Sequence, residues 1–225
     1  RNFKVKFESN FEIKKIEISD QFIQSLKLPD RIQPRDYQLI AANHALSHHR
    51  TLLLSPTASG KSLIIYILVR YLKLKTLILV PTTSLVSQMY NDFREYGWDV
   101  ANNCHTVFAG RDKGSELPVV ISTWQSIYKL NQKYFEQYEL VIGDEAHGFK
   151  SKSLTSIMTK CVNAKYRIGT TGTLDGTQTH ELVLEGLFGK VYKVTSTKKL
   201  IDSKLLSPFT IKAILLRHPD SICHD

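Results

Sequence analysis

The chain has 225 residues, a formal net charge of +9 and 42% hydrophobic residues. This length is ample for a buried core, and the ordinary composition excludes intrinsic disorder and fibrous repeats. Its apolar runs are shorter than the roughly 20 residues needed to cross a bilayer, and residues 1–18 lack the charged start and apolar block of a signal peptide. The three cysteines are scattered, so we expect a protein of the reducing cytoplasm without disulfides.

The positive charge lies mainly in the two flanks of the chain. Residues 1–35 and 188–225 hold most of the excess of Lys and Arg, whereas residues 36–187 are nearly balanced. A basic surface can bind nucleic acid by neutralising phosphates, and it can equally serve only to keep the protein soluble. The charge therefore permits a polyanionic partner without identifying one.

Short apolar strands and amphipathic helices alternate along most of the chain. Strand-like alternation covers residues 3–18, and a short helix is predicted over residues 20–28. From Asp36 onward the pattern predicts helices over 36–49, from the turn after residue 55 to about 74, and over 83–96, between short strands at 51–55, 76–80, 119–122, 140–143 and 166–169. Such continuous apolar strands are buried on both faces. The predicted fold class is therefore α/β, a mainly parallel sheet with helices on both faces.

Ligands of such sheets bind beyond the carboxyl ends of the strands, so the residues that follow each strand carry the most information. The strand at 51–55 leads into Ser55-Pro56-Thr57-Ala58-Ser59-Gly60-Lys61-Ser62. This run matches the phosphate-loop pattern, with Ser55 in place of the first Gly. Small residues let backbone N–H groups surround a phosphate at a helix N-terminus. Lys61 would reach the outer phosphates and Ser62 would bind Mg²⁺, unless the run is only a helix start made of small residues.

The strand at 140–143 leads into Asp144-Glu145-Ala146-His147. Asp144 would hold Mg²⁺ directly or through water, and Glu145 would be the base that positions the attacking water. His147 is expected to link the nucleotide site to the moving parts of the protein. Alone, these residues could be an ordinary acidic helix cap. Combined with the phosphate loop, they predict a site that hydrolyses a nucleotide.

The two motifs together resemble motifs I and II of superfamily 2 helicases and translocases, with Asp144–His147 as the DEAH form of motif II. Other segments match in the same order. Pro34–Gln38 resembles the upstream element whose Gln reads the adenine edge, which implies ATP contacts by Arg35, Tyr37 and Gln38. Gly169–Thr173 lies where motif III lies, which implies that nucleotide and nucleic-acid sites are coupled through Thr171, Gly172 and Thr173. The family more often has Ser-Ala-Thr or Thr-Ala-Thr there.

The resemblance also implies a nucleic-acid path. Val80–Leu85 with Gln88 resembles motif Ia, and Ile121–Ser126 resembles a later element of the path. A polar turn adds two basic side chains that could touch phosphates. The candidate nucleic-acid contacts are Thr82, Thr83, Gln88, Arg111, Lys113, Thr123 and Trp124. Helix capping by the threonines, a core position for Trp124 and a solvated loop around Arg111 and Lys113 are alternatives that the residues leave open.

The resemblance covers about residues 32–204 and is nearest to phage recombination helicases of the UvsW type. It implies an N-terminal lead at 1–30, a RecA-like ATP-binding domain at 31–190 and an exit segment at 191–225. The family places ATP between two RecA-like domains, and the roughly 50 residues after Thr173 are too few for a second one. We therefore expect a fragment, monomeric in this form, whose second RecA-like domain follows in the natural chain.

The implied function is the ATP- and Mg²⁺-dependent motor domain of a helicase that remodels or unwinds branched DNA in recombination and repair. It would act in the cytoplasm, that of the host if the protein is of phage origin, with no membrane partner. DNA is preferred over RNA only through this resemblance, so an RNA helicase domain remains an alternative. A nucleotide-controlled clamp is disfavoured because Lys61, Ser62, Asp144 and Glu145 are intact. A phosphoryl-transfer kinase would leave Gln38 and motif Ia unexplained.

Overall fold

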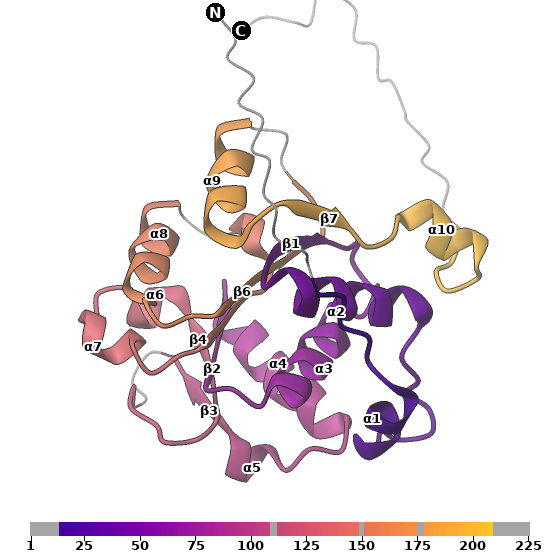
Figure 1. Cartoon of the computed structure of the whole chain (residues 1–225), viewed down its shortest axis with the longest axis horizontal. Coiled ribbons are helices and arrows are strands. Elements are labelled where there is room, and N and C mark those ends of the chain that lie inside the picture. The colour runs from indigo at the N-terminus through magenta and orange to yellow at the C-terminus, as the bar shows by residue number, and fades with distance from the viewer. Residues whose placement is uncertain (1–13, 109–111, 149–150, 175–177, 209–225) are drawn as a thin grey trace, which may run out of the picture.

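A seven-stranded parallel sheet forms the centre of the molecule (Figure 1). The computed structural model describes residues 14–108, 112–148, 151–174 and 178–208. The strands are β1 (Arg50–Leu54), β2 (Thr76–Val80), β3 (Cys104–Val107), β4 (Val119–Thr123), β5 (Leu140–Gly143), β6 (Tyr166–Thr171) and β7 (Val191–Lys193). They lie in the order β3-β4-β2-β5-β6-β1-β7, and every pair is parallel. The predicted fold class is confirmed.

Helices cover both faces of the sheet. One face packs against α1 (Asp20–Ser25), α2 (Asp36–His48), α3 (Lys61–Leu72), α4 (Thr83–Glu95) and α5 (Val100–Asn103). The other face packs against α6 (Trp124–Ile127), α7 (Gln132–Phe135), α8 (Ser151–Lys160) and α9 (Gln178–Phe188), and α10 (Thr197–Asp202) follows β7. Among the described residues, no helix combines the length and the apolar character that crossing a membrane requires.

Alternate side chains of each central strand enter two different cores. In β2, Ile78 and Val80 pack with α1–α5, whereas Leu77 and Leu79 pack with α6–α9. Successive side chains of a strand point to opposite faces, so a strand covered on both sides needs apolar residues at every position. This requirement is why the central strands were recognisable as unbroken apolar runs.

The N-terminal strand prediction is wrong where it can be checked. Residues 3–13 lie outside the described residues, and residues 14–19 form no strand. The backbone N–H groups of Ile16 and Ile18 instead donate to Ser47 Oγ and Asn43 Oδ1, both on α2. The apolar side chains of this segment pack against the core beside α1–α5. Alternation there reflects packing on a helix and not pairing in a sheet.

Two strands, β3 and β7, were not predicted. Both are short, and both lie at edges of the sheet. β7 pairs with β1, with Leu53 opposite Tyr192, so the sheet continues past the domain boundary expected at residue 190. Strands of three or four residues carry too little periodicity to be distinguished from loops.

Two glycines let α9 lie close to the sheet. A Cβ atom on Gly143 would lie 2.6 Å from Cζ of Phe188, and one on Gly169 would lie 3.0 Å from Cδ2 of the same ring. Phe188 is fully buried, so its ring has no room to move away. We expect Gly143→Ala to lower the free energy of unfolding by about 1–3 kcal/mol, because it overpacks the core. Urea denaturation would measure this change.

A matched control is available in α9 itself. A Cβ on Gly186 would meet nothing within 4 Å, so Gly186→Ala should raise the free energy of unfolding by roughly 0.5–1 kcal/mol through helix propensity. Equal stability of the two variants would contradict the close approach of Phe188.

Candidate nucleotide-binding site

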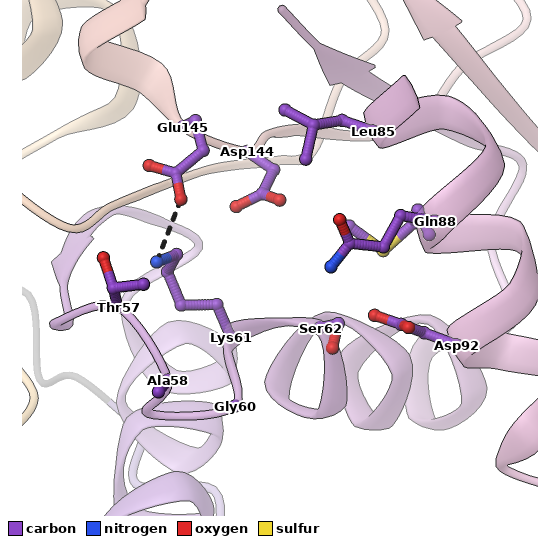
Figure 2. Close-up of a pocket in the computed structure, with 11 residues that line it drawn as sticks. Thr57, Ala58, Gly60, Lys61, Ser62, Leu85, Gln88, Asp92, Asp144 and Glu145 are labelled. Atoms are coloured by element: carbon purple, nitrogen blue, oxygen red, sulfur yellow. Dashed lines mark ion pairs between the residues drawn. The ribbon is translucent and has the colours of Figure 1, made fainter. Parts of the chain in front are cut away.

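A pocket of about 200 Å³ opens at the carboxyl edge of the sheet. Its walls come from the loop after β1, the start of α3, one face of α4 and the loop after β5 (Figure 2). The lining residues are Thr57, Ala58, Gly60, Lys61, Ser62, Leu85, Gln88, Met89, Asp92, Asp144 and Glu145. The sequence prediction that the residues after β1 and β5 meet at one site is therefore matched by the geometry.

The loop from Ser55 to Gly60 is fastened to its neighbours by hydrogen bonds. Ser55 N–H donates to the carbonyl of Thr171 at 2.9 Å, and Ser55 Oγ donates to Ser59 Oγ at 2.6 Å. Both serines are fully buried, so the hydroxyl at the position of the usual first Gly is used inside the loop. Gly60 has a φ of +79°, the left-handed conformation in which the helix begins and which a residue with a side chain rarely adopts. Because the Ser55 hydroxyl is bonded to Ser59, Ser55 does not line the pocket.

The N-terminus of α2 holds this loop from outside. Gln38 Nε2 donates to the carbonyl of Ser59 at 2.9 Å and to that of Gly60 at 3.3 Å, while Gln38 Oε1 accepts from Arg35 N–H at 2.8 Å. Tyr37 OH also donates to the Ser59 carbonyl, and the Arg35 guanidinium donates to Tyr37 OH. The three residues implied to contact ATP thus form a bracket behind the loop, and the amide of Gln38 is engaged at both ends.

Lys61 and Glu145 form an ion pair across the pocket. Nζ of Lys61 lies 3.0 Å from Oε1 of Glu145, and the Lys61 side chain is only 9% exposed (Figure 2). Asp144 lies beside them, 7% exposed, and its Oδ1 accepts a hydrogen bond from the Thr170 hydroxyl. Burial raises the pKa of Asp144, and the nearby Glu145 charge raises it further, against the opposing effects of Thr170 and Lys61. This carboxylate is desolvated and close to a cation, as a buried metal ligand would be.

A chain of contacts connects the Glu145 loop to β6. The Thr171 hydroxyl donates to the carbonyl of Thr173 at 2.8 Å, so its oxygen must accept from His147 Nδ1, which lies 2.7 Å away. The same Nδ1 lies 3.5 Å from Oε2 of Glu145. A Cβ on Gly172 would lie 3.7 Å from Lys61 Nζ. The residues that resembled motif III therefore lie against both the phosphate loop and the acidic loop.

One wall of the pocket was missed from the sequence. Asp92 lines the pocket from α4, and Tyr96 OH lies 2.8 Å from Ser62 Oγ. Burial raises the pKa of Asp92, and the nearby Ser62 hydroxyl opposes that rise. Gln88 lies on the same wall (Figure 2), although motif Ia had suggested a nucleic-acid contact. The available signal was the i, i+4 spacing of 88, 92 and 96, which places three polar side chains on one face of a helix.

The remaining nucleic-acid candidates have separate locations. Thr82 and Thr83 are exposed at the start of α4, where Thr82 Oγ1 accepts from Leu85 N–H, so Thr82 serves as a helix cap. Thr123 is buried at the end of β4, and its hydroxyl contacts Ser126 Oγ at 2.8 Å. Gln125 Nε2 donates to the Pro81 carbonyl and so links the two segments. They adjoin the nucleotide pocket along the carboxyl edge of the sheet.

Trp124 lies in the core and not on a surface that could stack on a base. Its side chain is 8% exposed and packs among the residues of α6–α9. The core alternative left open by the sequence is the one observed. Lys113 is exposed in the loop before β4, and Arg111 lies outside the described residues.

The residues of the pocket fit ATP and Mg²⁺. The left-handed Gly60, the N-terminus of α3 and the amine of Lys61 form a cradle for phosphate oxygens. Ser62 and Asp144 offer a hydroxyl and a carboxylate, which are oxygen ligands of the kind Mg²⁺ prefers. Because Mg²⁺ keeps several waters and binds substrate phosphates, one or two protein oxygens are enough.

Comparisons with known proteins point to one family. The family described as "Type III restriction enzyme, res subunit" matches residues 31–176. The chain is 32% identical over 212 residues to the ATP-dependent DNA helicase uvsW of Enterobacteria phage T4, covering 89% of this chain and 42% of that protein. It is 28% identical over 204 residues to the DNA 3'-5' translocase XPB2 of Sulfurisphaera tokodaii, covering 89% and 45%. The chain thus spans less than half the length of these curated relatives.

Solved structures agree with this result. A crystal structure of the UvsW helicase from bacteriophage T4 superposes with a TM-score of 0.71 at 33% identity, covering 80% of this chain and 70% of that one. A DEAD box protein from Methanococcus jannaschii superposes with a TM-score of 0.65 at 16% identity, covering 84% and 56%, and shares the fold. The RecA-like helicase fold and the resemblance to superfamily 2 helicases of the UvsW type are confirmed.

The bracket behind the loop generates a prediction about Gln38. Gln38→Ala would leave the carbonyls of Ser59 and Gly60 without this donor, and we expect it to lower the free energy of unfolding by about 1–2 kcal/mol. Because the loop serves any nucleotide, binding of ATP and GTP should weaken by a similar factor. Chemical denaturation and competition against a fluorescent nucleotide would measure the two effects. A loss confined to ATP would show that Gln38 reads the adenine, as the family resemblance implied.

Proposed function

This chain belongs to the family described as "Type III restriction enzyme, res subunit", and from that premise we propose that it is the ATP-hydrolysing motor domain of a superfamily 2 DNA helicase or translocase. The observation that carries the proposal is the meeting of Lys61 and Glu145 at 3.0 Å, across the pocket that the loop after β1 forms with the loop after β5. An amine at a phosphate cradle and a carboxylate beside it are two of the groups that phosphoryl transfer to water uses.

We propose the following division of labour among the residues. When ATP binds, its phosphate oxygens replace Glu145 as the ion-pair partner of the Lys61 amine. Glu145 is then free to accept a proton from the attacking water. Ser62 and Asp144 would hold Mg²⁺, whose charge offsets that of the phosphates. Thr57, Ala58, Ser59 and Gly60 present the backbone of the loop to the phosphates, while Ser55 and Pro56 begin the loop and set its path.

The contact between His147 and Thr171 supports a coupling role. His147 Nδ1 lies within reach of both Glu145 and Thr171, and Thr171 leads through Thr173 and Gly172 to the surface beside the loop. A change at Glu145 on hydrolysis would therefore alter the hydrogen bonds that hold β6 and its following loop. We propose that this chain of contacts transmits the nucleotide state, with the two residues Thr171 and Thr173 in place of the more usual Ser-Ala-Thr pattern.

DNA is the proposed nucleic-acid partner. Both curated relatives are named for action on DNA, and the exposed Thr82 and Thr83 adjoin the pocket where a phosphate backbone could pass. Branched DNA, a part in recombination and repair, and a phage origin are the finer proposals, and they rest on the likeness to the phage T4 protein. A cytoplasmic location follows from the same proposal.

Two substitutions separate binding from hydrolysis. Lys61→Ala should weaken ATP binding at least tenfold, because Lys61 is the cation that lines the described pocket. Glu145→Gln should leave ATP binding unchanged or tighter, because it removes the carboxylate that competes for Lys61, while hydrolysis falls by about 10²–10⁴. Nucleotide binding and phosphate release would be measured for both. Near-normal hydrolysis by either variant would refute the proposed site.

Another prediction concerns the part of the curated relatives that this chain does not match. Arginines from a second domain are typically worth about 10³–10⁵ in the rate of phosphoryl transfer. We expect residues 1–225 to bind ATP and Mg²⁺ weakly, to hydrolyse ATP slowly and to leave a duplex intact. Joining the chain to a natural C-terminal continuation should restore DNA-stimulated ATPase activity and strand separation.

Assays should compare single-stranded, duplex, forked and four-way DNA with matched RNA. Stimulation by RNA alone would favour an RNA helicase. Robust unwinding by residues 1–225 alone, abolished by Lys61→Ala, would contradict the proposal that a second domain is needed for strand separation. Nucleotide-dependent DNA binding without phosphate release would indicate a clamp.

A further inference from the structure

We propose that Asp92 of α4 and Tyr96, the C-cap residue of that helix, are positioning residues that orient the Ser62 hydroxyl toward a divalent cation. This inference rests on the proposed function, because it concerns the same nucleotide pocket. It adds a second layer to the cation side of that pocket, supplied by a helix that none of the phosphate-binding motifs includes. The argument starts from the hydrogen bonds of one hydroxyl group.

The Ser62 hydroxyl has two neighbours. Tyr96 OH lies 2.8 Å from Ser62 Oγ, and the Asp92 carboxylate lines the pocket beside Ser62 (Figure 2). A serine hydroxyl offers one hydrogen and two lone pairs, and an ionised carboxylate can only accept. In the arrangement that we propose, Ser62 donates its hydrogen to Asp92. Tyr96 is then the donor in the other bond, and it occupies one lone pair of Ser62.

This arrangement leaves one lone pair of Ser62 with a fixed direction. With its hydrogen engaged by Asp92 and its first lone pair by Tyr96, the hydroxyl cannot rotate freely. Asp92 and Ser62 line the same pocket as Asp144 and Lys61 (Figure 2). The remaining lone pair of Ser62 is therefore available to a cation bound in that pocket. Outer residues that orient a metal ligand in this way commonly change metal affinity by about 10–100-fold.

The helix is well placed to hold these two side chains. Asp92 lies in the last turn of α4, and the backbone N–H of Tyr96, the C-cap residue, donates to the carbonyl of Asp92 at 2.9 Å. The Tyr96 ring packs against the fully buried Tyr66 of α3, with ring centroids 5.1 Å apart. α3 is also the helix that Lys61 and Ser62 begin. The packing of α3 against α4 therefore sets the position of the hydroxyl.

The experiment measures the gain in nucleotide affinity that magnesium provides. A fluorescent ADP derivative is titrated into the 225-residue chain, once with Mg²⁺ and once with EDTA, and the ratio of the two Kd values is the magnesium gain. This quantity does not depend on hydrolysis. We expect Asp92→Ala to reduce the gain about tenfold. Tyr96→Phe keeps the ring and removes one hydrogen bond, and it should reduce the gain about threefold.

The matched control is Glu95→Ala. Glu95 lies on the same helix and carries the same charge, but its side chain is 61% exposed and faces Arg31 instead of the pocket. It should leave the magnesium gain unchanged. An equal fall for Glu95→Ala and Asp92→Ala would show that only the overall charge of α4 matters, and would overturn the inference.

A double-mutant cycle with Ser62→Ala tests whether Asp92 acts through Ser62. If it does, Asp92→Ala has no further effect on the gain once Ser62 is replaced. If Asp92 attracts the cation directly, its effect persists in that background, and the positioning role is overturned. A wild-type gain that both Asp92→Ala and Tyr96→Phe leave intact would overturn the inference alone. A wild-type chain without any magnesium gain would also overturn the metal role proposed for Ser62.

Discussion

The parallel direction of all strands in the described sheet is the constraint from which the site follows. Parallel strands bring their carboxyl ends to one edge, so each loop that leaves a strand there can meet the others. The strand order places β6 between β1 and β5. Lys61 follows β1 and Glu145 follows β5, so their ion pair spans the end of that middle strand. Thr170 and Thr171 end β6 directly beneath the pair, and their hydroxyls contact Asp144 and His147.

The same constraint explains how much could be predicted from the sequence. Strands buried on both faces are continuous apolar runs, so their ends, and the loops after them, could be located without a structure. Lys61 and Ser62 follow one strand and Asp144 and Glu145 another, and knowing the edge was enough to bring them together. The predictions that failed concern a segment that packs against another element and strands that are very short. Residues 14–19 alternate because they pack on α2, and β3 and β7 are too short to show a period.

Asp92 and Gln38 illustrate two further limits of the sequence. Asp92 reaches the pocket only because α3 packs against α4, and no motif records that packing. Gln38 matched an adenine-reading element, yet its amide lies so near the loop that a Cβ on Gly60 would be 2.3 Å from its Nε2. Position 60 therefore requires glycine for two reasons, the positive φ and the space that the Gln38 side chain needs. Only the first of these is visible in the pattern.

The electrostatics of the pocket add a final step. Its described lining carries one cationic side chain, Lys61, and three carboxylates, those of Asp92, Asp144 and Glu145. A triphosphate that enters such a pocket without a cation brings more negative charge close to these partly desolvated carboxylates. Salt screens the repulsion between the phosphates and the carboxylates only weakly inside the pocket. Lys61 can offset one charge, and only after it leaves Glu145. A divalent cation beside Ser62 would offset two more, at the end of the pocket where Asp92 lies. The excess of carboxylates therefore favours the nucleotide–magnesium complex over the free nucleotide as the species that this pocket is built to hold.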